Sequence, residues 1–202
     1  MILPALSGFV LSGSLIIAIG AQNAYILRMG LAQHHVFWLC LFCAVSDAVL
    51  IILGVAGLGA LVEANPGTLN IFALGGALFL FSYAALAFKR ALNPAAMQLE
   101  NGSKPSLLKA LSTCAAFTWL NPHVYLDTVM LIGAYAAQYA PVERMAYGAG
   151  AVLASFVWFF ALGYGAQLLA PVFSRRAAWQ ALDIAIAVIM AVLAASLLRQ
   201  VF

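Results

Sequence analysis

Acidic, amide and imidazole side chains occur at a few places inside long apolar segments of this chain. The densest group is Thr118–Asp127, TWLNPHVYLD, in an apolar segment that begins at Ala110 and carries no charge before Asp127. A charged group at the centre of a membrane helix costs roughly 2.5–3.5 kcal/mol on insertion scales, so it normally serves a ligand or a polar path. Pro122 also removes a backbone donor and disrupts the helical ladder before it. Lipid-exposed backbone cannot tolerate this, so the stretch is expected to face protein or a water-filled cavity.

Two carboxylates lie inside these segments. We interpret Asp47, isolated near the middle of its span, as a counter-ion for a cationic solute or as a proton carrier. Its structural alternative is a hydrogen bond to a neighbouring helix, beside Ser46. Asp127 follows His123 by four residues, so the two share a face if the helix resumes after Pro122. The pair would relay a proton, or Asp127 would bind an ammonium or guanidinium group while His123 binds elsewhere on the solute; the structural alternative is a private ion pair.

Amide side chains accompany both expected breaks in the helical pattern. Gln22 and Asn23 follow Gly20, and Asn121 precedes Pro122. An opened helix presents free carbonyls at one end and free amides at the other, and free amides at a half-helix N-terminus suit a carboxylate. With the two aspartates, these groups complement a zwitterion that carries an extra positive charge. In the structural alternative, Gln22 and Asn23 satisfy each other or the backbone.

The composition places the chain in a membrane. It has 202 residues, of which 66% are hydrophobic and 7% charged, whereas a soluble domain carries roughly a quarter charged residues. A net charge of +3 with scattered basic residues gives no argument for nucleic acid. The N-terminus lacks the basic region of a signal peptide, so it is expected to belong to the first mature helix. We therefore predict an all-α polytopic membrane protein that is not an enzyme, with no nucleotide signature, cofactor or metal.

Six transmembrane helices are predicted in one domain over residues 1–202. The half-repeats are about 1–90 and 105–202, joined by a polar loop at about 90–109. Each half has a polar break in its first span, which indicates two inverted three-helix repeats whose broken helices meet near the midplane. The predicted spans are Leu3–Leu27, Val36–Val62, Leu69–Phe88, Ala110–Val142, Met145–Ala170 and Ala177–Leu198.

The distribution of lysine and arginine predicts the orientation. The loops after the first, third and fifth spans hold seven such residues, and the opposite side holds only Arg144 and Arg199. Loop 90–109 is therefore expected in the cytoplasm and both termini outside. The seven residues are Arg28, Lys89, Arg90, Lys104, Lys109, Arg175 and Arg176.

Small residues recur every four positions in the last two spans, and such rows let helices approach closely in lipid. We interpret them as packing within one chain, in preference to a dedicated dimer face, and a homodimer stays an open alternative. The rows are Ala146, Gly150 and Ala154, and Ala187, Ala191 and Ala195.

Cys40 and Cys43 define an alternative kind of site. They share a helix face, and His34 and His35 precede them. Two thiolates and a histidine suit a soft metal, or the cysteines form a redox pair. The chain would then be a heavy-metal exporter or an intramembrane thiol oxidoreductase. Buried membrane cysteines usually behave as small apolar residues, so this is the weaker hypothesis.

Three blocks of sequence resemble the LysE-type family of lysine and arginine exporters. They are GAQNAYILRMGL at 20–31, CAVSDAVLI at 43–51 and TWLNPHVYLDT at 118–128, and the resemblance covers nearly the whole chain. The third block is more typical of the basic-amino-acid branch than of branches that export neutral amino acids. Ala21 departs from the family, where many relatives have proline beside the glutamine.

The resemblance implies a secondary active exporter of L-lysine or L-arginine, or both, in the bacterial cytoplasmic (inner) membrane. Proton exchange or the membrane potential would drive it, and its partners would be a basic amino acid and the lipid bilayer. Combined with the residues above, the hypothesis is alternating access with Gly20 and Pro122 as helix breaks. The expected substrate-binding residues are Asp47, Asp127, Gln22, Asn23, Asn121 and His123.

Overall fold

The computed structural model describes residues 1–17, 20–57, 66–92 and 105–201, and every regular element in these ranges is a helix. Within these ranges, three helices are long and apolar enough to cross a membrane. The bent pair α1 (Ile2–Ile16) and α2 (Ala21–Leu31) gives a fourth span if the two helices are counted together. The described residues therefore form an all-helical protein with three or four clear spans. Six spans and an inverted repeat remain predictions. The three clear spans are Val36–Val55, Pro141–Leu169 and Arg176–Arg199.

The first broken segment bends sharply near Gly20. The axes of α1 and α2 meet at an angle of 81°. Gly20 precedes α2 with an extended backbone, φ −113° and ψ 176°, so a new helix starts at Ala21. Gln22 and Asn23 consequently lie in the first turn of α2, where backbone N–H groups have no partner within the helix.

Asn121 and Pro122 interrupt the second broken segment. The side chain of Asn121 accepts a hydrogen bond from the His123 N–H at 3.2 Å, which caps the new helix. Pro122 is its first residue, where a missing N–H costs nothing. The chain then widens into a π-helix, a form that is rare and frequent at functional sites. The four pieces are α7 (Leu107–Trp119), α8 (Pro122–Val124), the π-helix η1 (Tyr125–Leu131) and α9 (Ile132–Ala136).

The predicted boundary between the fourth and fifth spans is wrong. The fourth segment was expected to reach Val142, but its last helix ends at Ala136. Pro141 opens the next helix, so Val142 belongs to that helix instead. The fixed φ of proline suits the first turn of a helix, which explains the shift.

The remaining long helices follow the predicted spans with changed ends. The second span was expected to reach Val62, but its helix ends at Val55, just before Gly57 with a φ of 95°, which a right-handed helix cannot contain. Residues 58–62 lie outside the described ranges. These helices are α3 (Val36–Val55), α5 (Pro66–Leu92), α10 (Pro141–Gly165) with the short 3-10 turns η2 (Ala166–Leu169) and η3 (Val172–Ser174), and α11 (Arg176–Val201).

Helices α1 and α10 approach each other closely through glycines. A Cβ atom at Gly8 would collide with the backbone carbonyl of Tyr147, and one at Gly150 with the carbonyl of Ala5. Gly150 belongs to the predicted row of small residues, so this part of the row packs within the chain.

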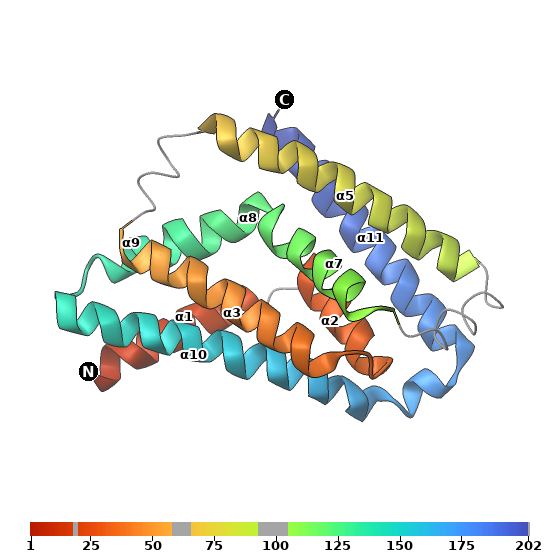
Figure 1. Cartoon of the computed structure of the whole chain (residues 1–202), viewed down its shortest axis with the longest axis horizontal. Coiled ribbons are helices and arrows are strands. Elements are labelled where there is room, and N and C mark those ends of the chain that lie inside the picture. The colour runs from red at the N-terminus through yellow and green to blue at the C-terminus, as the bar shows by residue number, and fades with distance from the viewer. Residues whose placement is uncertain (18–19, 58–65, 93–104, 202) are drawn as a thin grey trace.

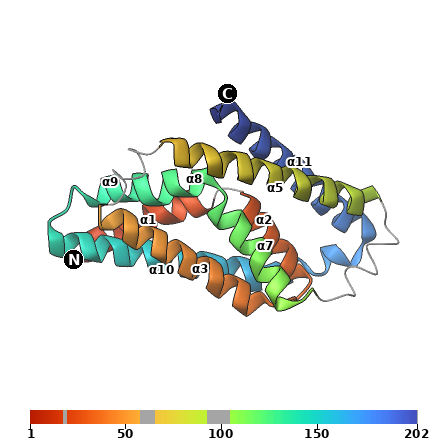
Figure 2. The same ribbon diagram turned by 45° about the horizontal axis from the view of Figure 1, so that its top comes forward.

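The helices form two groups. Figure 1 and Figure 2 show α5 and α11 packed side by side, while α1, α2, α3 and α10 lie together with the broken segment α7–α9. The α5–α11 pair meets the rest at the second break, where a Cβ atom at Gly76 would collide with the Leu120 carbonyl. The two breaks therefore lie at the junction of the two groups.

Candidate functional site

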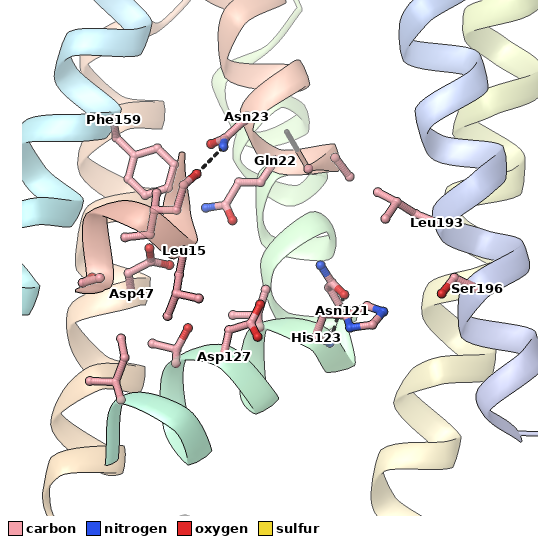
Figure 3. Close-up of a pocket in the computed structure, with 17 residues that line it drawn as sticks. Leu15, Gln22, Asn23, Asp47, Asn121, His123, Asp127, Phe159, Leu193 and Ser196 are labelled. Atoms are coloured by element: carbon pink, nitrogen blue, oxygen red, sulfur yellow. Dashed lines mark hydrogen bonds between the residues drawn. The ribbon is translucent and has the colours of Figure 1, made fainter. Parts of the chain in front are cut away.

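A cavity of about 360 Å³ lies where the two broken segments meet. It is lined from both helix groups, by residues of α1, α2, α3, α8, η1, α9, α10 and α11. Figure 3 shows the amide of Gln22 and the carboxylates of Asp47 and Asp127 directed into the same space. All six side chains expected to bind substrate line this cavity: Gln22, Asn23, Asp47, Asn121, His123 and Asp127. Gly20 lines it as well, whereas Pro122 is buried behind it.

Asp47 projects from α3 and is 5% exposed. Its Oδ2 atom accepts a hydrogen bond from the hydroxyl of Ser155 on α10, at 3.4 Å. The ion pairs found in the described part of the chain involve other residues, so no lysine or arginine described here neutralises this carboxylate. A buried carboxylate without a paired cation is costly, and a cationic ligand in the cavity would offset that cost.

Asp127 lies in the π-helix and is exposed. It interacts electrostatically with His123 at the start of the same segment. His123 lies in α8 and Asp127 in the π-helix that follows it. A π-helix has i→i+5 hydrogen bonds and a wider turn than an α-helix. The relative direction of the two side chains therefore differs from that of an i, i+4 pair in an α-helix. The cavity thus has one buried carboxylate and one that solvent can reach.

The amide of Asn23 is held by the protein on both sides. Its Nδ2 donates to the carbonyl of Ile16, the last residue of α1, at 2.6 Å. Its Oδ1 accepts from the indole N–H of Trp158 on α10, at 3.3 Å. Asn23 therefore fastens the two halves of the first broken segment to each other and to α10, which agrees with the structural alternative for this residue.

Two other polar groups of the cavity wall lack ordinary hydrogen-bond partners. The buried Ser12 hydroxyl has no hydrogen bond to a described residue, and the buried Nε2 atom of Gln22 has none to a described oxygen or nitrogen, although Gln22 interacts with the thiol of Cys43. Both residues line the cavity. Buried polar groups are nearly always hydrogen-bonded. The missing hydrogen bonds of Ser12 and Gln22 therefore indicate that a polar ligand or water completes the site.

Sequence reasoning did not assign five polar residues at or behind this wall to the site. Ser12, Thr128 and Ser196 line the cavity, while Ser155 and Trp158 hold Asp47 and Asn23. Isolated hydroxyls in apolar spans give little signal, because serine and threonine commonly bond a carbonyl of their own helix.

The cysteine alternative finds no support. The thiol of Cys40 donates to the carbonyl of Phe159 at 3.1 Å, and that of Cys43 lies 2.9 Å from the Cys114 sulfur. His35 binds the carbonyl of Pro105 at 2.8 Å. In the described ranges, no three histidine, cysteine or acidic side chains are grouped so that they could hold a metal ion.

An apolar helical protein with broken helices around a polar cavity has the architecture of a membrane transporter. The chain belongs to the LysE type translocator family, whose model matches residues 13–201. Members of this family are transporters, so the prediction that the chain is not an enzyme is confirmed, as is the resemblance stated from the three sequence blocks.

Relatives agree with this assignment. The chain is 42% identical over 174 residues to a candidate amino-acid transporter of Mycobacterium bovis, covering 86% of each protein. It is 35% identical over 195 residues to the arginine exporter ArgO of Salmonella typhimurium, covering 96% of this chain and 92% of that protein. No solved structure matches the chain. These findings support export of an amino acid across a membrane.

Proposed function

We propose that this protein is a secondary active exporter of basic L-amino acids, arginine or lysine or both, across the bacterial inner membrane. The observation that carries the proposal is one cavity lined by two carboxylates and by the amides of the first helix break. Its volume of about 360 Å³ lies within the range of small-molecule sites. The relative named as an arginine exporter supports a basic substrate.

The two ends of a basic amino acid find complementary groups in this cavity. Asp47 and Asp127 bind the α-ammonium and the side-chain cation. The first N–H groups of α2 and the amide of Gln22 suit the α-carboxylate, because the N-terminus of a helix favours an anion. Asn121 caps α8 and His123 stands beside it, facing α11 (Figure 3).

Alternating access would use the two helix groups. The cavity lies between them, with Leu193 and Ser196 of α11 on one wall and Asp47 of α3 on the other. Movement of the α5–α11 pair relative to the rest would open the cavity to one side and then to the other. Asp127 is exposed and interacts with His123, so this pair is suited to pass a proton between the cavity and its surroundings.

A flux assay with purified protein in liposomes tests the proposal. Labelled arginine, lysine and a neutral amino acid such as leucine are compared, with and without an imposed pH gradient or membrane potential. We expect transport of arginine or lysine well above that of leucine, and stimulation by at least one gradient. Equal transport of leucine, or none of the basic amino acids, would contradict the proposal.

A further inference from the structure

A second charged cluster lies outside the cavity and joins three helices. Asp183 of α11 is fully buried, and its Oδ1 atom accepts hydrogen bonds from Arg28 of α2 and Arg90 of α5. The nitrogen atoms of Arg90 lie 3.2 and 3.3 Å from that oxygen. The Oδ2 atom of Asp183 is buried and has no partner among the described residues. One carboxylate oxygen of Asp183 thus accepts hydrogen bonds from both arginines, and the other accepts none from either arginine.

This cluster lies beyond the cavity, at the end of the molecule predicted to face the cytoplasm. Asn23 lines the cavity and Arg28 is five residues further along α2, about 7.5 Å at the rise of an α-helix. On α11, Leu193 lines the cavity and Asp183 precedes it by ten residues, about 15 Å. Along both α2 and α11, the ion pairs therefore lie between the cavity and that end of the molecule.

Aromatic rings fill the space beside the ion pairs. Arg28 lies 5.8 Å from the ring of Trp179, and Arg90 lies 5.4 Å from that of Tyr83. Tyr83 in turn packs on Phe117, with ring centroids 4.9 Å apart, and on Tyr25 at 6.1 Å. Ion pairs and aromatic rings thus connect α2, α5, α7 and α11 at this end of the molecule.

The two arginines differ in which helix group they belong to. Arg90 and Asp183 are both on the α5–α11 pair, whereas Arg28 is on α2 in the other group. Separation of the groups at this end would keep the contact between Arg90 and Asp183 and break the contact between Arg28 and Asp183. The buried carboxylate would then lose one cation, which is unfavourable unless another takes its place.

We propose that Asp183 selects the substrate during opening, by exchanging Arg28 for the guanidinium or ammonium group of the entering amino acid. This proposal rests on the proposed export of basic amino acids and adds a residue that acts before the cavity is reached. The unpartnered Oδ2 gives Asp183 the capacity to bind a guanidinium through both oxygens, the arrangement that arginine and carboxylate groups favour. A neutral amino acid cannot replace Arg28 and leaves the path closed.

Inside-out membrane vesicles test the exchange, because added substrate meets the cytoplasmic face and export is measured as uptake. Arginine is compared with citrulline, which has the same shape but a neutral ureido group. In Asp183→Asn we expect the arginine-to-citrulline ratio of kcat/KM to fall about tenfold, since the amide forms no charge-assisted pair. An unchanged ratio in a folded variant would overturn the proposal.

A second pair of variants decides the matter even if Asp183→Asn fails to fold. Arg28→Gln removes the cation that the substrate must displace, so the KM for arginine is expected to fall about fivefold while closure of the path weakens. The matched variant Arg90→Gln leaves Arg28 in place as the competitor and is not expected to lower the KM. Equal effects of both variants, or a higher KM in Arg28→Gln, would overturn the proposal.

Measurements on the wild-type protein distinguish failure of this proposal from failure of the proposed function. If wild-type vesicles take up citrulline and arginine at equal rates, the proposed export of basic amino acids is itself contradicted. A wild type that discriminates, with a discrimination unchanged in the variants, contradicts only the role of Asp183.

Discussion

Asp47 is a buried carboxylate whose described partner is a single serine hydroxyl. Its position was evident from the sequence, because a charge in the middle of an apolar run is conspicuous. The hydrogen bond from Ser155, 108 residues away, was not evident. The same contrast holds for Asn23, whose amide was expected at the site but whose hydrogen bond from Trp158 was not predicted. Polar residues in apolar runs reveal where a site lies, but not which neighbours hold it.

Replacement of Asp47 by asparagine should reduce arginine export. The neutral side chain keeps the shape and loses the attraction for the cation, so we expect kcat/KM to fall at least about tenfold, the scale of one charged hydrogen bond. Ser155→Ala should cause a smaller loss of about threefold to fivefold. Initial rates of labelled arginine flux measure both. Glu143→Gln, at an exposed carboxylate near the start of α10, is the control and should transport normally.

Replacement of Trp158 by phenylalanine tests whether Asn23 must be held in place. The variant keeps an aromatic ring and loses the N–H that binds Asn23, so we expect the KM for arginine to rise about threefold to fivefold, the worth of one hydrogen bond. Trp38→Phe is the matched control, because Trp38 is 53% exposed on α3. The same rise in both variants, or in neither, would contradict a specific role for the contact with Asn23.

At the scale of elements, the helix breaks were the most predictable feature. Glycine followed by two amides, and asparagine followed by proline, interrupt helices for simple backbone reasons, and α2 and α8 start at those positions. The π-helix at Tyr125–Leu131 was not predictable. This stretch, YLDTVML, contains no glycine or proline and carries no local signal that distinguishes the wider form from an ordinary α-helix.

The contact between α1 and α10 sets the position of the first broken segment. Gly150→Ala places a Cβ atom against the Ala5 carbonyl, and such overpacking should destabilise the protein by about 1–3 kcal/mol. Thermal unfolding in detergent measures this as a lower Tm. The control is Gly13→Ala in α1, where no atom lies within 4 Å of the added Cβ, and alanine favours a helix over glycine. A loss of Tm in Gly13→Ala equal to that in Gly150→Ala would contradict this explanation.

In the molecule as a whole, two helix groups enclose a polar cavity and contact each other again at the ion pair between Arg28 and Asp183. The ion pair between Arg28 and Asp183 joins residues 155 positions apart. The sequence placed Arg28 among the residues that set the orientation and did not predict its pairing with Asp183. Pairings across such separations depend on how the helices are arranged, which composition and periodicity do not specify. The orientation in the membrane and the number of spans likewise remain predictions.

The central claim is that carboxylates in the cavity replace the water around a positively charged amino acid. Efflux of labelled arginine from liposomes that contain the double variant Asp47→Asn with Asp127→Asn tests it most directly. We expect efflux to fall by at least about a hundredfold, tenfold for each lost charge, while the variant stays folded. Efflux at the wild-type rate from the folded double variant would contradict it.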